Sequence, residues 1–130
     1  MSFYSKHSPT PHFTHTRTAN ATISKGVALK LSSGKYDVAG AGDNGVAIAL
    51  EDAASGAQAT ASHLGFCLAL VDGSGSAIAE GDFLIPTTAG KLIKATGNVR
   101  GIAYACDAST ASGDLIGVFI LPCPVGTATA

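Results

Sequence analysis

The stretch GVAIALEDA at residues 45–53 recurs 56 residues later as GIAYACDAS at residues 101–109. In the first copy the larger side chains of Val46, Ile48 and Leu50 alternate with alanines. An alternation with a period of two residues is typical of a β-strand that has one bulky face and one small face. The two copies therefore predict two equivalent strands, at residues 46–50 and 102–106.

The repeat extends outward from this strand in both copies. SSGK at residues 32–35 superposes on TAGK at 88–91, and SKGVALKL at 24–31 lies over AEGDFLIP at 79–86 with a one-residue slip. Glycines recur at the bends, because bends need backbone angles that other residues rarely adopt. The sequence therefore predicts two related halves, each a strand, turn, strand, loop, strand unit. The matched glycines are Gly26, Gly34 and Gly45 in the first half and Gly81, Gly90 and Gly101 in the second.

The rest of the chain shows short apolar runs separated by glycine-rich turns, with no amphipathic stretch long enough for a substantial helix. This pattern predicts an all-β fold, a small β-barrel or sandwich with an internal pseudo-repeat, and it does not separate the two architectures. The predicted strands are residues 27–31, 35–39, 46–50, 66–71, 83–85, 91–95, 102–106 and 115–121.

Residues 1–20 differ from the rest, because they hold three of the four histidines and no Leu, Ile or Val. We predict that they form an extended N-terminal arm and contribute no strand to the core, followed by a β domain at 21–122 and a C-terminal tail at 123–130. Three aromatic side chains in this arm indicate that it docks on protein, with a frayed tail as the alternative. These are Phe3, Tyr4 and Phe13.

The composition excludes several classes of partner. Only 13% of the residues are charged and the formal net charge is −1, so no polyanion-binding surface is expected and nucleic acid is not a predicted partner. A surface with so little charge favours contact with other protein. No apolar run approaches the 18 or more residues of a membrane span, and no signal sequence is recognisable, so synthesis in a cytoplasm is expected.

The sequence indicates no motif for catalysis, metal binding or cofactor binding. The sequence contains no GxSxG, HExxH or GxxxxGK[ST] motif. The arm histidines include an HxxH spacing but no second shell, and His63 is interpreted as a structural or surface residue. Three cysteines without a CxxC pair are interpreted as buried small hydrophobic residues. We therefore expect no enzyme activity, no metal and no cofactor. The residues concerned are His7, His12 and His15 in the arm, and Cys67, Cys106 and Cys123.

The order of these elements resembles the small β-rich capsid cement, or decoration, proteins of tailed bacteriophages. Their chains run glycine, apolar strand, turn, Gly-Val-Ala, acidic alanine-rich loop, Ala-x-Gly-Asp, apolar strand. The resemblance covers residues 21–122. The matching stretches are SKGVALKL from Ser24, NGVAIALEDAASG from Asn44, AIAEGDFLIP from Ala77, TAGKLIKA from Thr88 and RGIAYACDASTASGDLIGVFIL from Arg100.

This resemblance implies a structural virion protein on the capsid exterior, made in the host cytoplasm, that stabilises the head by bridging adjacent major capsid protein subunits. It also implies contact between neighbouring copies, with a homotrimer as the first oligomer to test. The arm would then reach a neighbouring subunit, with Phe3, Tyr4 and Phe13 as predicted anchors and Arg17 as a polar contact.

Two alternatives remain open. The chain is consistent with another virion component, such as a tail or spike accessory domain. It is also consistent with a non-viral carrier or ligand-binding β module, for which Lys35 and Lys91, each following a turn glycine, are the candidate attachment points.

Overall fold

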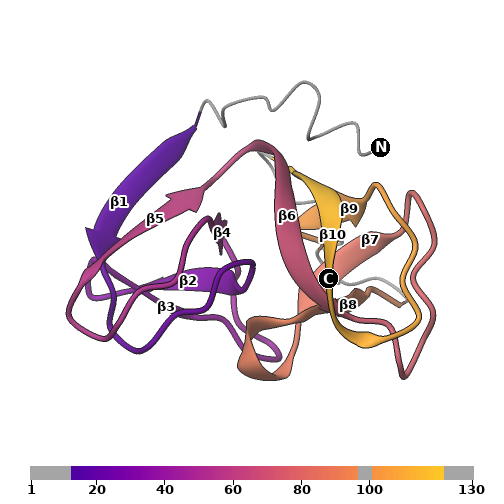
Figure 1. Ribbon diagram of the computed structural model, residues 1–130, viewed down its shortest axis with the longest axis horizontal. Helices are drawn as coiled ribbons and strands as arrows, with labels where there is room; N and C mark the ends of the chain where they lie inside the picture. The colour runs from indigo at the N-terminus through magenta and orange to yellow at the C-terminus, as the bar shows by residue number, and fades with distance from the viewer. Residues whose placement is uncertain (1–12, 97–100, 122–130) are drawn as a thin grey trace, which may run out of the picture.

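A computed structural model describes residues 13–96 and 101–121. Within these residues the chain forms ten β-strands and one short 3-10 turn at Thr88–Gly90, arranged as two β structures side by side (Figure 1). The prediction of an all-β fold is confirmed, and the second structure is a closed barrel.

The N-terminal half is a five-stranded sheet with the order β1-β5-β4-β2-β3, and the C-terminal half is a barrel with the order β10-β6-β8-β7-β9. The strands of the sheet are β1 (Thr14–Thr18), β2 (Ala28–Ser32), β3 (Lys35–Val38), β4 (Ala47–Ala49) and β5 (Gln58–Ser62). The strands of the barrel are β6 (Gly65–Asp72), β7 (Phe83–Pro86), β8 (Leu92–Lys94), β9 (Ala103–Ala105) and β10 (Ser112–Ile120).

The two halves have the same topology. Started from β6, the barrel reads β6-β10-β9-β7-β8, which matches β1-β5-β4-β2-β3 strand for strand. Even the closing contact recurs, because Ala19 bridges Tyr36 in parallel where Val71 bridges Leu92. The predicted repeat is confirmed, and it extends from three strands in each half to five.

The hairpin turns show why both halves carry a glycine at the same position. Ser33 and Gly34 have φ angles of 51° and 75°, and Ala89 and Gly90 have 60° and 77°. Two successive residues with positive φ reverse the chain tightly between antiparallel strands, and the second position suits glycine, which has no Cβ to clash. The SSGK and TAGK stretches therefore form the same turn.

The prediction that residues 1–20 contribute no strand was wrong. β1, at Thr14–Thr18, pairs with β5 along five residues. Both strands were missed because hydrophobic runs identify strands with bulky inward side chains, whereas β5 is QATAS and turns only alanines inward. The rest of the predicted arm, residues 1–12, and the C-terminal tail lie outside the described residues.

Two clusters of buried side chains form the core. One fills the barrel and includes Ala28 and Ile48 from the other half, so the halves share apolar packing. The second lies inside the N-terminal sheet around Tyr36, whose side chain is fully buried. At the positions of Cys67 and Ala69 on β6, β1 carries His15 and Arg17.

Candidate protein-docking surface

Four aromatic side chains form a continuous row on the outside of the barrel. Phe66 on β6 pairs with Phe119 on β10, Phe119 pairs with Tyr104 on β9, and Tyr104 pairs with Phe83 on β7. The rings of Phe66 and Phe119 meet edge to face with centroids 4.9 Å apart, and those of Phe119 and Tyr104 stack at 5.5 Å. These four residues are called the aromatic face below.

The aromatic face is open at several points. Phe83 is 45% exposed, and Leu68, which shares the outer face of β6, is 38% exposed. Phe66, Tyr104 and Phe119 are partly exposed, whereas the alternate residues of the same strands point into the barrel and are buried. Aromatic and apolar side chains gathered on an exterior surface are characteristic of protein interaction sites.

The matching row in the N-terminal half is largely buried. Its pairings are Thr14 with Ser62, Ser62 with Ile48, and Ile48 with Ala28, which repeat the pairings of the aromatic face. Ser62, Ile48 and Ala28 are fully buried, and the last two pack against the barrel core. One half therefore uses this row to hold the molecule together, and the other half presents it outward.

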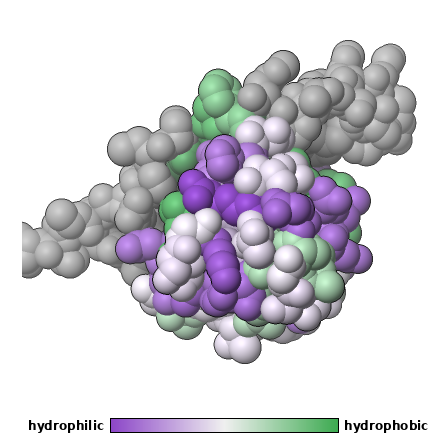
Figure 2. All heavy atoms as spheres, turned by 90° about the vertical axis from the view of Figure 1, so that its left-hand side faces the viewer, coloured by the Kyte–Doolittle hydropathy of each residue, from purple (hydrophilic) through white to green (hydrophobic). Residues whose placement is uncertain are grey.

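The opposite end of the molecule is polar. Figure 2 views the N-terminal sheet from the left of Figure 1 and shows hydrophilic residues across the middle of the described surface, with near-neutral residues and small apolar patches around them. On β1, Thr14 and Thr16 are exposed, and the Arg17 guanidinium donates to the Gly34 carbonyl over 3.0 Å. A polar end on one repeat and an aromatic face on the other give the chain one preferred side for apolar contact.

Of the four residues predicted to contact a partner protein, two lie in the described part of the chain. Phe13 is 57% exposed, and its carbonyl accepts a hydrogen bond from the His63 amide over 2.8 Å. Arg17 is half-buried and lies 6.0 Å above the Tyr36 ring, so its side chain is held by its own sheet. Phe3 and Tyr4 lie outside the described residues, and partner binding by these four residues stays a prediction.

The aromatic face itself was not predicted. The signal was present, because Phe66, Tyr104 and Phe119 lie in predicted strands at positions that alternate with small or aliphatic residues. What was missing was the order of strands. Without the pairing of β10 with both β6 and β9, nothing in the sequence brings these rings together.

His63 belongs to the interior of the N-terminal half. Its Nε2 lies 2.6 Å from the Tyr36 hydroxyl, which also donates to the His15 carbonyl over 3.3 Å. Burial raises the pKa of Tyr36, and burial, with smaller contributions from His15 and Arg17, lowers the pKa of His63. This hydrogen bond pairs the buried Tyr36 hydroxyl with the half-buried His63 ring, as the interpretation of His63 as structural expected.

The cysteines and histidines show no reactive or metal-binding arrangement in the described part of the chain. Cys67 is buried and Cys106 half-buried, both as free thiols, and burial raises the pKa of Cys67 to about 12. No group of three or more His, Cys, Asp or Glu residues is placed to hold a metal within residues 13–96 and 101–121. His7, His12 and Cys123 lie outside the described residues.

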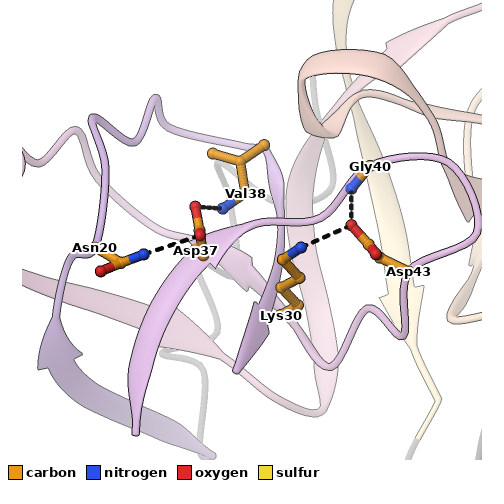
Figure 3. A network of polar contacts seen from close by, with 6 residues as sticks. All are labelled: Asn20, Lys30, Asp37, Val38, Gly40 and Asp43. Carbon is orange, nitrogen blue, oxygen red and sulfur yellow. Dashed lines mark hydrogen bonds and ion pairs between the residues drawn. The ribbon is translucent and has the colours of Figure 1, made fainter. Parts of the chain in front are cut away.

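A shallow pocket lies where the two halves meet. It has a volume of about 260 Å³, below the range of about 300–1,000 Å³ that is usual for small-molecule sites. One wall is the loop after β3, where Asp43 accepts hydrogen bonds from the Gly40 amide at 2.8 Å and the Lys30 ammonium at 3.0 Å (Figure 3). The backbone hydrogen bond first, and Lys30 second, lower the pKa of Asp43. This network braces the loop. The pocket is lined by Gly42, Asp43, Asn44, Gly45, Ile85, Pro86 and Ile102.

No helix in the described part of the chain has the length and apolar character needed to cross a membrane. The lysines that the carrier alternative requires lie at matching turns: Lys35 is exposed, and the Lys91 ammonium donates to the Ser112 hydroxyl over 3.1 Å.

Comparisons with known proteins agree with this architecture. The N base of the head fiber gp8.5 of bacteriophage phi29 has a similar fold, with a TM-score of 0.65 over 88% of this chain and 98% of that one, at 18% identity. No curated protein matches the chain. The family model described as phage cement protein matches residues 7–122, nearly the whole length, so the chain belongs to the phage cement protein family.

Proposed function

We propose that this chain binds the outer surface of an assembled phage capsid and stabilises it by bridging adjacent major capsid protein subunits. The aromatic face carries the proposal, because it offers an apolar surface for protein on one side of a molecule that is polar at its other end. Membership of the cement protein family supports a capsid as the target. The role needs no catalytic group and no cofactor.

Bridging requires two contacts on different subunits. The aromatic face is one, and the N-terminal segment that precedes β1 is the other. Twelve residues reach up to about 40 Å when extended, which is enough to span from one subunit to the next. Phe3 and Tyr4 in this segment are the anchors of the second contact, and the exposed Phe13 marks its base.

Many copies bound at symmetry-related positions would stabilise a shell even when each contact is weak, because linked contacts raise the local concentration of the others. A homotrimer around a threefold point would place three aromatic faces and three N-terminal segments on the same patch of capsid. Such an arrangement joins several major capsid protein subunits at once.

Co-sedimentation with undecorated heads of the cognate phage tests the proposal. The full chain should bind saturably, and Phe83→Ser should weaken binding at least tenfold, since truncating an aromatic residue that anchors an interface costs about 2 kcal/mol or more. Gln58→Ala is the matched control, because Gln58 is exposed at the polar end of the molecule. A chain lacking residues 1–12 should bind but stabilise the heads less against heating.

Two outcomes contradict the proposal. The first is a full chain that does not sediment with cognate heads at any concentration. The second is a Phe83→Ser variant that binds as tightly as the full chain does, and a loss of binding in Gln58→Ala would then move the contact to the polar end. Analytical ultracentrifugation of the free protein tests the homotrimer separately.

A further inference from the structure

The N-terminal half contains a row of residues equivalent to the aromatic face. In the N-terminal half, Ala28, Ile48 and Ser62 of the same row are fully buried, and Ala28 and Ile48 pack against the barrel core. In the barrel the row holds larger apolar rings, and Phe83 is substantially exposed, as is Leu68 on the same outer face of the barrel. Removing such side chains from water is favourable at about 25 cal/mol for each Å² of apolar surface. Covering the aromatic face with another protein segment would therefore remove more apolar surface from water than covering the equivalent row of the N-terminal half.

The N-terminal segment enters the fold beside this face. β1 begins at Thr14, which pairs with Ser62, and the Phe13 carbonyl accepts a hydrogen bond from the His63 amide. Two residues after His63 the chain starts β6 at Gly65, opposite Ile120. The described chain thus begins, at Phe13, beside the short connection that leads into Phe66, the end of the row nearest β1.

The composition of the segment suits the face. Residues 1–12, MSFYSKHSPTPH, include Met1, Phe3 and Tyr4 and a single charged side chain, Lys6. Prolines at positions 9 and 11 favour extended backbone. Crossing four strands requires only about 15 Å at a spacing of about 4.8 Å between strands, well within the reach of twelve extended residues.

We propose that in the free protein residues 1–12 lie across the aromatic face of their own chain, with the Phe3 and Tyr4 side chains packed on its rings. The short tether favours this occupant, since a segment attached beside its site has an effective concentration in the millimolar range. The docking concerns the free protein, in which no capsid competes for the segment or for the face.

Photo-crosslinking of the purified full chain, without capsids, tests this docking. Tyr104→p-benzoylphenylalanine places the probe in the middle of the row, and mass spectrometry should find it joined to residues 1–12. Gln58→p-benzoylphenylalanine, at the polar end, is the matched control and should not reach that segment. Mixing ¹⁵N-labelled and unlabelled protein identifies the donor chain, and the crosslinked peptides should carry one label only.

Crosslinks that join labelled to unlabelled chains would overturn the proposal in favour of a second copy, and crosslinks confined to other parts of the chain would overturn it outright. A second measurement does not depend on the probe. Deleting residues 1–12 should raise the binding of an apolar dye such as anilinonaphthalene sulfonate several-fold, and unchanged dye binding would contradict the docking. Because no capsid is present, failure here is distinguishable from failure of the capsid-binding proposal.

Discussion

The N-terminal sheet and the C-terminal barrel have the same strand order and the same turns, yet they use the same surface in opposite ways. Ala28, Ile48 and Ser62 make the inner junction of the molecule, and Phe83, Tyr104 and Phe119 at the matching positions make an outward aromatic face. Backbone topology is thus shared between the repeats, and the side chains on one face decide whether a repeat packs inward or outward.

The interiors differ as well. The barrel closes around Cys67, Ala69 and Leu92, whereas at the same positions the sheet carries the exposed His15, the half-buried Arg17 and the buried Tyr36. The polar side chains are partly satisfied by local hydrogen bonds, although the Arg17 Nε is buried without a partner among the described residues. The second repeat holds an apolar core, and the first holds a core with a polar section.

Exchanging matched residues of the two rows should change the free energy of unfolding more than any of the other substitutions. Ala28→Phe installs the side chain of Phe83 at a fully buried position and should destabilise the protein by about 3 kcal/mol, because overpacking displaces the neighbouring half. Phe83→Ala should cost less than about 1 kcal/mol, since its ring is already half in water. Urea denaturation measures both. Equal losses would show that the two rows are not used differently.

The turn glycines give a second matched pair. A Cβ at Gly90 would lie 2.8 Å from both Val27 Cβ and Val38 Cγ1 of the other half, whereas no atom of the described residues comes within 4 Å of a Cβ at Gly34. Both alanine variants bear the strain of a positive φ, about 1 kcal/mol. Gly90→Ala should lose about 2 kcal/mol more by overpacking. Thermal unfolding checks the difference, and a Gly34→Ala variant that is equally unstable would contradict a junction at Gly90.

The polar core should make the first half sensitive to acid. Burial lowers the pKa of His63 from 6.5, so the unfolded chain binds protons more readily and stability falls as the pH drops below about 6.5. His63→Gln should flatten the dependence of the melting temperature on pH between about 7 and 5. Tyr36→Phe is the control, because it removes the hydrogen bond and keeps the titrating ring, at a cost of about 1 kcal/mol. Parallel pH profiles for the histidine and glutamine forms would refute this role.

Because Cys67 lies in the apolar core of the barrel, we expect its thiol to react slowly with alkylating reagents. With a pKa of about 12 in place of 9.0, Cys67 at pH 8 has on the order of a thousandfold less thiolate than an ordinary cysteine. Maleimide labelling of the native protein, followed by peptide mapping, should modify the half-buried Cys106 well before Cys67. Rapid labelling of Cys67 would show that the barrel opens readily.

The sequence was a good guide to the strands whose buried side chains are large. Eight strands were predicted close to their observed bounds, and the repeat of GVAIALEDA and GIAYACDAS correctly related β4 to β9. β1 and β5 were missed because an edge strand such as THTRT, and an inward face of alanines, produce no hydrophobic run. Pairing with neighbours stabilises these strands, and pairing is a tertiary property.

By itself, the sequence determined the all-β class, the turns that require positive φ, and the duplication, because each depends on residues close together in the chain. Only the tertiary structure decided which row of the repeat is buried and which is exposed. Phe66, Phe83, Tyr104 and Phe119 are spread over more than fifty residues, and they become one surface because β10 lies between β6 and β9 and β7 lies beyond β9.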